Sequence, residues 1–174
     1  MKAVFLDRDG TLIVDPPDLR VDSINDIHLF PDTLEALALL ASLNFVVIEV
    51  TNQAGIAEGR IDRAEFETIN NKVLEILESS GVKILKIYMC PHAPEDNCVC
   101  RKPKPYLLLQ AAKDFDIDLA QSYLIGDRLS DIEAGINAGT KTILVQTGNV
   151  PVTSDKVTYT AANLLEAVQY IAAH

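Results

Sequence analysis

The sequence has no long apolar run, no excess of basic residues and few cysteines, and each shortage excludes a class of protein. No stretch of the 174 residues approaches the roughly twenty apolar residues that span a bilayer, so we expect no membrane partner. Lys and Arg number 15 against 25 Asp and Glu, and the formal net charge of -10 argues against nucleic acid as a partner. Met1 leads directly into an apolar segment without a signal-peptide pattern, which predicts a cytoplasmic location.

The apolar content is sufficient for one buried core. Hydrophobic residues make up 48% of the chain, and its length suits one domain better than two. We therefore expect residues 1–174 to form a single domain, and a monomer rather than an oligomer. Apolar runs recur with helical segments between them, which predicts an α/β fold with a doubly wound, mostly parallel, Rossmann-like sheet.

Strands and helices are expected to alternate along the chain. The predicted strands are residues 3–6, 45–50, 84–89, 122–125 and 142–145. The predicted helices are residues 31–43, 62–80, 106–115, a short segment ending at Gly139, and 161–172. Residues 12–31 show no helical period, and we interpret them as a flap or short hairpin over the edge of the sheet. Its aspartates are most simply a solvated face, although one or two could contact a substrate amine or hydroxyl: Asp15, Asp18, Asp22 and Asp26.

The segment from Phe5 to Leu12 changes from an apolar strand into charged residues. Ligands of open α/β sheets bind just beyond the carboxyl ends of the strands, where Asp7 and Asp9 lie. With Gly10 to turn the backbone, these carboxylates supply a nucleophile and a proton carrier within reach of one metal ion. The alternative is an ordinary Asp-Gly turn with solvated aspartates.

Polar side chains also follow the second and fourth predicted strands. Thr51, Asn52 and Gln53 supply a hydroxyl and two amides, which suit a phosphate group but also suit a plain polar turn. Asp127 follows the fourth strand, where it is placed to complete an oxygen-ligated magnesium site with Asp7. The predicted site therefore draws on three strand ends.

All three cysteines and one of the three histidines fall within one short stretch. The pattern is C-x-H-x5-C-x-C, formed by Cys90, His92, Cys98 and Cys100. Three thiolates and an imidazole make a closed tetrahedral zinc site of the structural kind. Such an ion would brace a loop with too little apolar sequence to order itself. The alternative is a chance cluster of reduced cysteines.

A basic segment follows the last of these cysteines. Because the overall charge repels anionic substrates, a local cluster of cations must attract them. We interpret Lys102 as a phosphate clamp and Arg101 as a substrate contact, with Arg128 as a further cation near the site. Asp131 lies one helical turn after Asp127, and it either favours the start of a helix or orients Lys102 or the waters of the metal.

Four separated signatures, in order, resemble the haloacid dehalogenase superfamily of phosphohydrolases. They are Asp-x-Asp-Gly-Thr from Asp7, Thr51 after the second strand, the Arg-Lys-Pro segment with Lys102, and Gly-Asp-x-x-x-Asp at 126–131. The resemblance implies a phosphoric monoester hydrolase in which Asp7 forms an aspartyl-phosphate and Asp9 serves as acid and then base. It also implies Mg²⁺ bound by Asp7, Asp127 and the backbone carbonyl of Asp9. Thr51, Asn52 and Lys102 would hold the phosphoryl oxygens.

The zinc pattern makes the chain similar to a narrower group, the D-glycero-D-manno-heptose 1,7-bisphosphate 7-phosphatases and the histidinol-phosphate phosphatase domains. Short insertions imply a fold without a large cap domain. The surplus of cations favours a sugar bisphosphate and a role in carbohydrate metabolism, although Glu58 stands where many heptose enzymes are expected to have arginine. The spacing of the zinc ligands and the acidic flap favour histidinol phosphate instead.

A function of another class is a non-catalytic phospho-receiver or a zinc-braced interaction module on the same sheet. A receiver would need Asp7 to keep its phosphate. Asp9 offers the base that removes it, which favours the enzyme.

Overall fold

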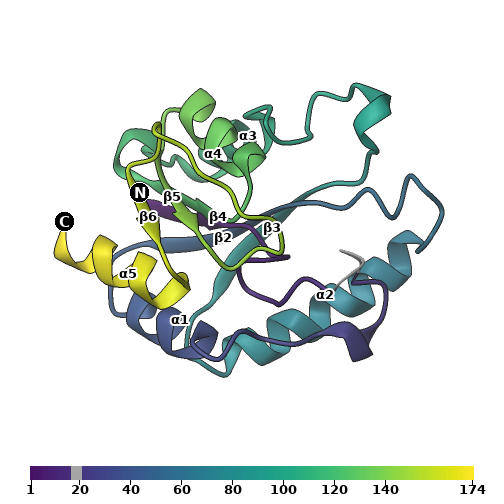
Figure 1. Ribbon diagram of the computed structural model, residues 1–174, viewed down its shortest axis with the longest axis horizontal. Helices are drawn as coiled ribbons and strands as arrows, with labels where there is room; N and C mark the ends of the chain where they lie inside the picture. Colours follow the sequence, from purple (N-terminus) through teal and green to yellow (C-terminus); the bar gives the residue numbers. More distant parts are fainter. Residues whose placement is uncertain (17–20) are drawn as a thin grey trace.

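The computed structural model describes residues 1–16 and 21–174, which form a parallel sheet covered by helices on both faces (Figure 1). The strands are β1 Ala3–Leu6, β2 Val46–Asn52, β3 Ile84–Cys90, β4 Tyr123–Gly126, β5 Lys141–Val145 and β6 Tyr159–Ala161. They lie in the order β3-β2-β1-β4-β5-β6, and every pairing is parallel. The predicted doubly wound α/β fold is confirmed.

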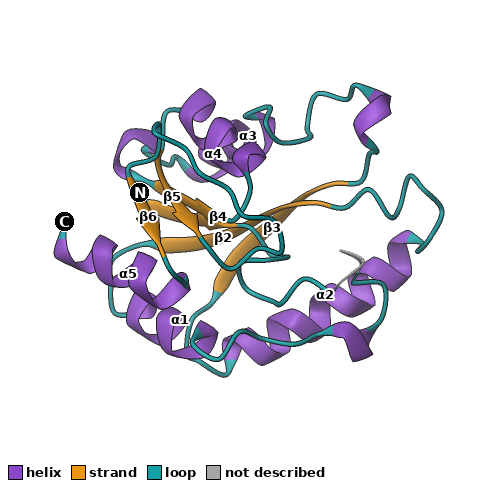
Figure 2. Cartoon of the chain, in the orientation of Figure 1, coloured by secondary structure: helices purple, strands orange, loops and turns teal. Residues whose placement is uncertain are grey.

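The helices divide into two layers, visible on opposite sides of the sheet in Figure 2. One layer holds α1 Thr33–Ala41, α2 Arg63–Glu78 and α5 Leu164–Ala173, and the other holds α3 Tyr106–Phe115 and α4 Leu129–Ala138. Short 3-10 turns are η1 Ile24–Asp26, η2 Pro94–Asp96 and η3 Leu119–Gln121. In the described part of the chain, no helix is long and apolar enough to cross a membrane.

The apolar run at the start of the chain is unbroken because β1 is buried on both faces. Val4 and Leu6 pack into the core under α1, α2 and α5, whereas Ala3 and Phe5 pack into the core under α3 and α4. All four side chains are fully buried. A strand that is covered on both faces needs apolar residues at every position, and this central strand carries the first catalytic candidates at its end.

The end of the chain differs from the sequence expectation. Residues 159–161 form β6, where the sequence predicted the start of a helix at Ala161. The helix α5 begins only at Leu164, because the side chain of Asn163 caps it by accepting a hydrogen bond from the Glu166 N–H (2.9 Å). A three-residue strand is too short to show a period in the sequence, and pairing with β5 stabilises it.

The segment after β1 folds back on itself, as the expected hairpin would. Ile13 pairs with Leu29 in an antiparallel bridge, and Leu12 and Ile13 are fully buried. The expectation of a wholly solvated acidic face is wrong for Asp15, which is only 5% exposed. Asp18 lies outside the described residues.

Candidate active site

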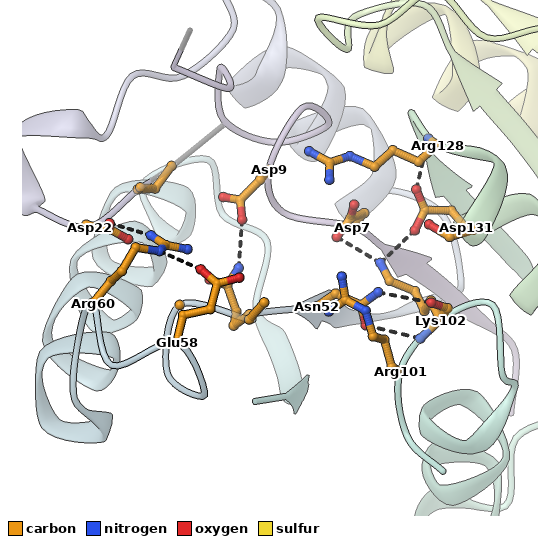
Figure 3. Close-up of a pocket in the computed structure, with 15 residues that line it drawn as sticks. Asp7, Asp9, Asp22, Asn52, Glu58, Arg60, Arg101, Lys102, Arg128 and Asp131 are labelled. Atoms are coloured by element: carbon orange, nitrogen blue, oxygen red, sulfur yellow. Dashed lines mark hydrogen bonds and ion pairs between the residues drawn. The ribbon is translucent and has the colours of Figure 1, made fainter. Parts of the chain in front are cut away.

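Three strand ends meet at one edge of the sheet because β1 lies between β2 and β4. Asp7 follows β1, Thr51 lies near the end of β2, and Asp127 follows β4. Ligands of doubly wound sheets bind at such a position. A cleft of about 320 Å³ opens there (Figure 3). Its lining includes Asp7, Asp9, Asp22, Asn52, Gln53, Glu58, Arg60, Arg101, Lys102, Arg128, Ser130 and Asp131.

Three buried carboxylates gather at this edge. Each of Asp7, Asp127 and Asp131 has an oxygen within 4.8 Å of an oxygen of the other two. Burial, together with the charge of Asp131, raises the pKa of Asp7 to about 7, against the opposing effect of Lys102. Burial, together with the charge of Asp7, raises the pKa of Asp127 to about 8. The cluster therefore carries more negative charge than its surroundings stabilise.

Lys102 is the one buried ammonium group at this cluster within the described residues. Its Nζ lies 2.9 Å from Asp7 Oδ1 and 2.6 Å from Asp131 Oδ1, and it donates a hydrogen bond to the carbonyl of Val50 (2.8 Å). Figure 3 shows the ammonium group between the two carboxylates. Burial lowers the pKa of Lys102, but the carboxylates of Asp131 and Asp7 together outweigh it and raise the pKa, so the group stays charged.

Asp131 performs both of the tasks that its position in the sequence left open. One oxygen pairs with Lys102, and the other accepts a hydrogen bond from the backbone N–H of Arg128 (3.0 Å) at the start of α4. The carboxylate thus stabilises the helix start and fixes Lys102.

Asn52 supports Lys102 through the backbone. Its Nδ2 donates to the carbonyl of Lys102 (3.2 Å), and its Oδ1 accepts from the Lys102 N–H (3.1 Å). Both ends of the amide are therefore engaged with the chain. The structure places Asn52 at the cleft as predicted, but as a support for the Lys102 loop.

Asp9 is held by two neighbouring side chains. Its carboxylate accepts hydrogen bonds from Arg8 Nε (2.8 Å), Arg8 Nη2 (3.0 Å) and Gln53 Nε2 (2.6 Å). Gln53 Nε2 also donates to Thr51 Oγ1 (2.9 Å) and so links the ends of β1 and β2. From the sequence, Arg8 is one of the surplus cations near the site that a second phosphate would use, but the structure buries it fully and pairs it with Asp9.

Glycines form a close cradle around Asp127. A Cβ atom at Gly148 would lie 2.3 Å from Asp127 Oδ2, and one at Gly10 would lie 2.5 Å from the same oxygen. Thr147 Oγ1 donates to the Gly10 carbonyl (2.6 Å) and holds the two loops together. Thr147 and Gly148 follow β5, so the loop after this strand lies at the same edge of the sheet and against the carboxylate cluster.

The arginines of the cleft differ in their partners. Arg60 pairs with Asp22 and with Glu58 Oε2 (2.8 Å), and Arg128 Nη2 lies 2.8 Å from Asp15 Oδ2. The contact described for Arg101 is a hydrogen bond to the carbonyl of His92 (3.1 Å), and no carboxylate pairs with it among the described residues. Among the arginines of the cleft, Arg101 is therefore the one least neutralised by the described residues.

The cysteine cluster lies beyond the end of β3. Its sulfur atoms are 3.1 to 3.6 Å apart, and His92 Nδ1 is 3.3 Å from Cys100 Sγ. Zn–S bonds of about 2.3 Å place tetrahedral ligands only slightly further apart, at about 3.7 Å, so the four side chains fit a zinc ion. The cysteines are unbridged. Burial opposes ionisation of Cys98, but hydrogen bonds from the backbone N–H of Arg101 and from Cys90 and Cys100 together outweigh it and lower the pKa to about 7.

The sequence and the fold are both similar to those of known hydrolases. The family described as HAD-hydrolase-like matches residues 99–168. A D-glycero-beta-D-manno-heptose-1,7-bisphosphate 7-phosphatase of Helicobacter pylori (strain J99) is 39% identical over 171 residues, covering 98% of this chain and 97% of that protein. The corresponding protein of Bordetella bronchiseptica is 40% identical over 149 residues, covering 86% and 83%. This chain belongs to the haloacid dehalogenase-like hydrolases.

A solved structure extends the likeness to the whole fold. The D,D-heptose 1,7-bisphosphate phosphatase of B. bronchiseptica, complexed with magnesium and phosphate, has a TM-score of 0.91 and 34% identity, and the match covers 99% of each chain. The resemblance to a hydrolase family, predicted from four short signatures, is confirmed. In a haloacid dehalogenase-like hydrolase the buried cluster of Asp7, Asp127 and Asp131 fits a hard divalent cation, since its charge would offset the repulsion described above.

Proposed function

We propose that this chain is a magnesium-dependent phosphatase that removes the 7-phosphate of D-glycero-β-D-manno-heptose 1,7-bisphosphate. The observation that carries the proposal is the similarity, over 98% of the chain, to an enzyme of that name. The buried carboxylates beside Lys102 support it, because they suit phosphoryl transfer. The relatives described above favour the heptose substrate over histidinol phosphate and over a non-catalytic receiver.

The proposed reaction proceeds in two steps on Asp7. An oxygen of Asp7 attacks phosphorus and forms an aspartyl-phosphate, while Asp9 gives its proton to the leaving sugar oxygen. Asp9 then takes a proton from water, whose oxygen attacks the same phosphorus, and this releases inorganic phosphate and the Asp7 carboxylate. Lys102, 2.9 Å from Asp7, stabilises the charge on the phosphoryl oxygens together with Thr51.

Mg²⁺ would be held by Asp7, Asp127 and the backbone carbonyl of Asp9, and when bound it would offset the negative charge of the phosphoryl group. The glycine cradle around Asp127 supports this assignment, because it brings two backbone segments against that carboxylate. The four cysteine and histidine ligands would hold a structural Zn²⁺ that orders the loop before Lys102.

The second phosphate of the substrate needs a cation away from Asp7. We assign that task first to Arg101, which has no carboxylate partner among the described residues. Arg128 contributes less, because Asp15 already offsets its charge. A cytoplasmic location, a monomeric state and a single domain over residues 1–174 stay predictions from the sequence.

The test is a steady-state comparison of heptose 1,7-bisphosphate and histidinol phosphate with magnesium present. We expect kcat/KM to favour the heptose by roughly a hundredfold, equivalent to about 2.7 kcal/mol of transition-state stabilisation. ³¹P NMR of the product should show a remaining 1-phosphate. Asp7→Asn should lower kcat by about 10³-fold or more, and Asp155→Asn, at an exposed aspartate, serves as the control.

Three results would contradict the proposal. A preference for histidinol phosphate would reassign the substrate, and release of the 1-phosphate would reverse the orientation in the cleft. A folded wild-type protein without turnover of any phosphate ester would remove the enzymatic function.

A further inference from the structure

Arg60 lies on the wall of the cleft, in a compact loop between β2 and α2. Backbone hydrogen bonds close this loop: the Arg60 N–H donates to the Gly55 carbonyl (2.9 Å), and the Glu58 N–H donates to the Ala54 carbonyl (2.9 Å). The guanidinium group lies against Gly55, where a Cβ atom would be 2.9 Å from Arg60 Nη2. The loop backbone and the missing side chain therefore fix the position of this cation.

Two carboxylates neutralise Arg60. Its Nη1 pairs with Asp22, and its Nε lies 2.8 Å from Glu58 Oε2. One positive charge between two negative charges leaves the group of three side chains negative. The carboxylates would repel a phosphate group, so this wall of the cleft is unsuited to either phosphate of a bisphosphate. The second phosphate is better served by Arg101, as proposed above.

The same three side chains suit hydroxyl groups, which both donate and accept hydrogen bonds. Arg60 Nη2 has no hydrogen-bond partner within residues 1–16 and 21–174, so its N–H groups can donate to a ligand. A carboxylate can accept about four hydrogen bonds, so Asp22 and Glu58 can accept further ones beside their pairs with Arg60. All three side chains line the cleft. An ammonium group suits this wall less, because the guanidinium between the carboxylates would repel it.

The position of Asp9 places this wall on the side of the leaving group. Figure 3 shows Asp9 between Asp7 and the three charged side chains. Gln53, the first residue after β2, donates to Asp9 Oδ2 (2.6 Å) and so joins the Arg60 loop to this acid. In the proposed reaction Asp7 takes the phosphoryl group and Asp9 protonates the leaving oxygen. The rest of the substrate therefore extends past Asp9 towards Arg60.

We propose that Arg60, Asp22 and Glu58 form a hydroxyl-binding wall that determines specificity for a polyhydroxylated leaving group. Its occupant is the sugar chain attached to the phosphate that Asp7 removes. Arg60 supplies the donors, and the two carboxylates supply the acceptors. This inference rests on the proposed function and deepens it, because it assigns the choice between a polyol and other phosphate esters to these three side chains.

The test measures kcat and KM of wild type and Arg60→Gln on two substrates with magnesium present. Heptose 1,7-bisphosphate carries hydroxyl groups, whereas 4-nitrophenyl phosphate carries none. We expect Arg60→Gln to lower kcat/KM about tenfold for the bisphosphate, mainly through KM, and less than about twofold for the nitrophenyl ester. Arg63→Gln removes the same charge from an exposed position at the start of α2 and should change neither.

A second variant separates hydrogen bonding from charge. Gly55→Ala keeps every charge, but its Cβ would lie 2.9 Å from Arg60 Nη2 and should displace the guanidinium group. We expect a selective loss of about fivefold in kcat/KM for the bisphosphate, which raised salt leaves unchanged, because salt screens charges more than hydrogen bonds to a bound sugar. Melting temperatures near that of the wild type would show that the loop remains folded.

Equal losses on both substrates in Arg60→Gln, or wild-type kinetics in Gly55→Ala, would overturn the inference while leaving the proposed function intact. A wild-type enzyme that turns over neither substrate would instead defeat the proposed function. The two failures are distinguishable, because the first is seen only in the variants and the second is seen in the wild type.

Discussion

The carboxylate cluster and the cysteine cluster both follow strands of the same sheet, but they are held in different ways. Asp7 and Asp127 extend from neighbouring buried strands, and the fold places them together whatever their charge. Cys98 and Cys100 lie in a loop whose only regular segment is η2. A site built on adjacent strands is positioned by the core, whereas a site in such a loop is positioned by its own ligand.

The two clusters also differ in what a bound metal would do for the protein. The fold buries three carboxylates close together, and burial together with their mutual repulsion raises the pKa values of Asp7 and Asp127. The Mg²⁺ expected at the carboxylates would offset this repulsion, which folding creates. At the cysteines, the metal would supply the folding energy itself. Loss of Mg²⁺ should therefore lower mainly the activity, whereas loss of Zn²⁺ should lower mainly the stability.

The largest effect is expected when a proposed zinc ligand is replaced. Cys100→Ser should remove one tightly bound zinc per chain and lower the free energy of unfolding by about 3 kcal/mol or more, since metal binding is folding energy in such loops. Native mass spectrometry and denaturant titration would measure both. Val99→Ala, at an exposed residue between the same ligands, is the control and should change neither. A wild-type protein without zinc, whose stability is insensitive to chelators, would contradict the assignment.

A smaller effect is expected from the charge of Asp127 in metal-free protein. Its pKa rises from 3.8 to about 8 on folding, so the folded state binds the proton more tightly. Compared with Asp127→Asn, the wild type has its full free energy of unfolding below pH 3.8. This contribution is lost as the pH rises through about 8. We expect the variant to gain about 2 kcal/mol over the wild type between pH 4 and pH 8.

Denaturant titrations of both proteins in chelator at several pH values would measure that gain, and saturating magnesium should reduce it. A difference that stays constant with pH would show that folding does not raise the pKa of Asp127.

The smallest effect concerns the glycine cradle. Gly148→Ala should displace Asp127, because the new Cβ would lie 2.3 Å from its Oδ2. We expect about a tenfold increase in the magnesium concentration needed for half-maximal activity, equivalent to about 1.4 kcal/mol. Gly81→Ala is the contrasting variant: it strains a backbone at φ +84°, with open space around the Cβ, and should lower stability without changing the magnesium requirement. Equal magnesium requirements in the two variants would count against the cradle.

Much of the site was predictable because its residues follow strands that can be recognised locally. The run before Asp7 and the run before Asp127 are apolar at every position, which is typical of strands buried on both faces. Side-chain pairings were harder to predict. Asn52 has the chemistry of a phosphate ligand, but its amide holds the Lys102 backbone, and Asp15 belongs to an acidic segment but pairs with Arg128.

β6 and Arg8 show two other limits. A three-residue strand has no period of its own, and it exists because β5 offers an edge to pair with. Arg8 lies in a charged turn, where most side chains face solvent. Its burial depends on α2, which places Phe66 and Asn70 around it from a distant part of the sequence.

The sequence by itself determined the order of the first five strands and the five helices, both sets of candidate metal ligands and the family resemblance, because these depend on residue type and local periodicity. Only the tertiary structure decided that Lys102 joins Asp7 to Asp131, that Thr147 reaches the Gly10 carbonyl, and that Arg8 lies against Phe66. Those contacts connect residues far apart in the chain. They depend on strand order and register, which the packing of the whole core selects.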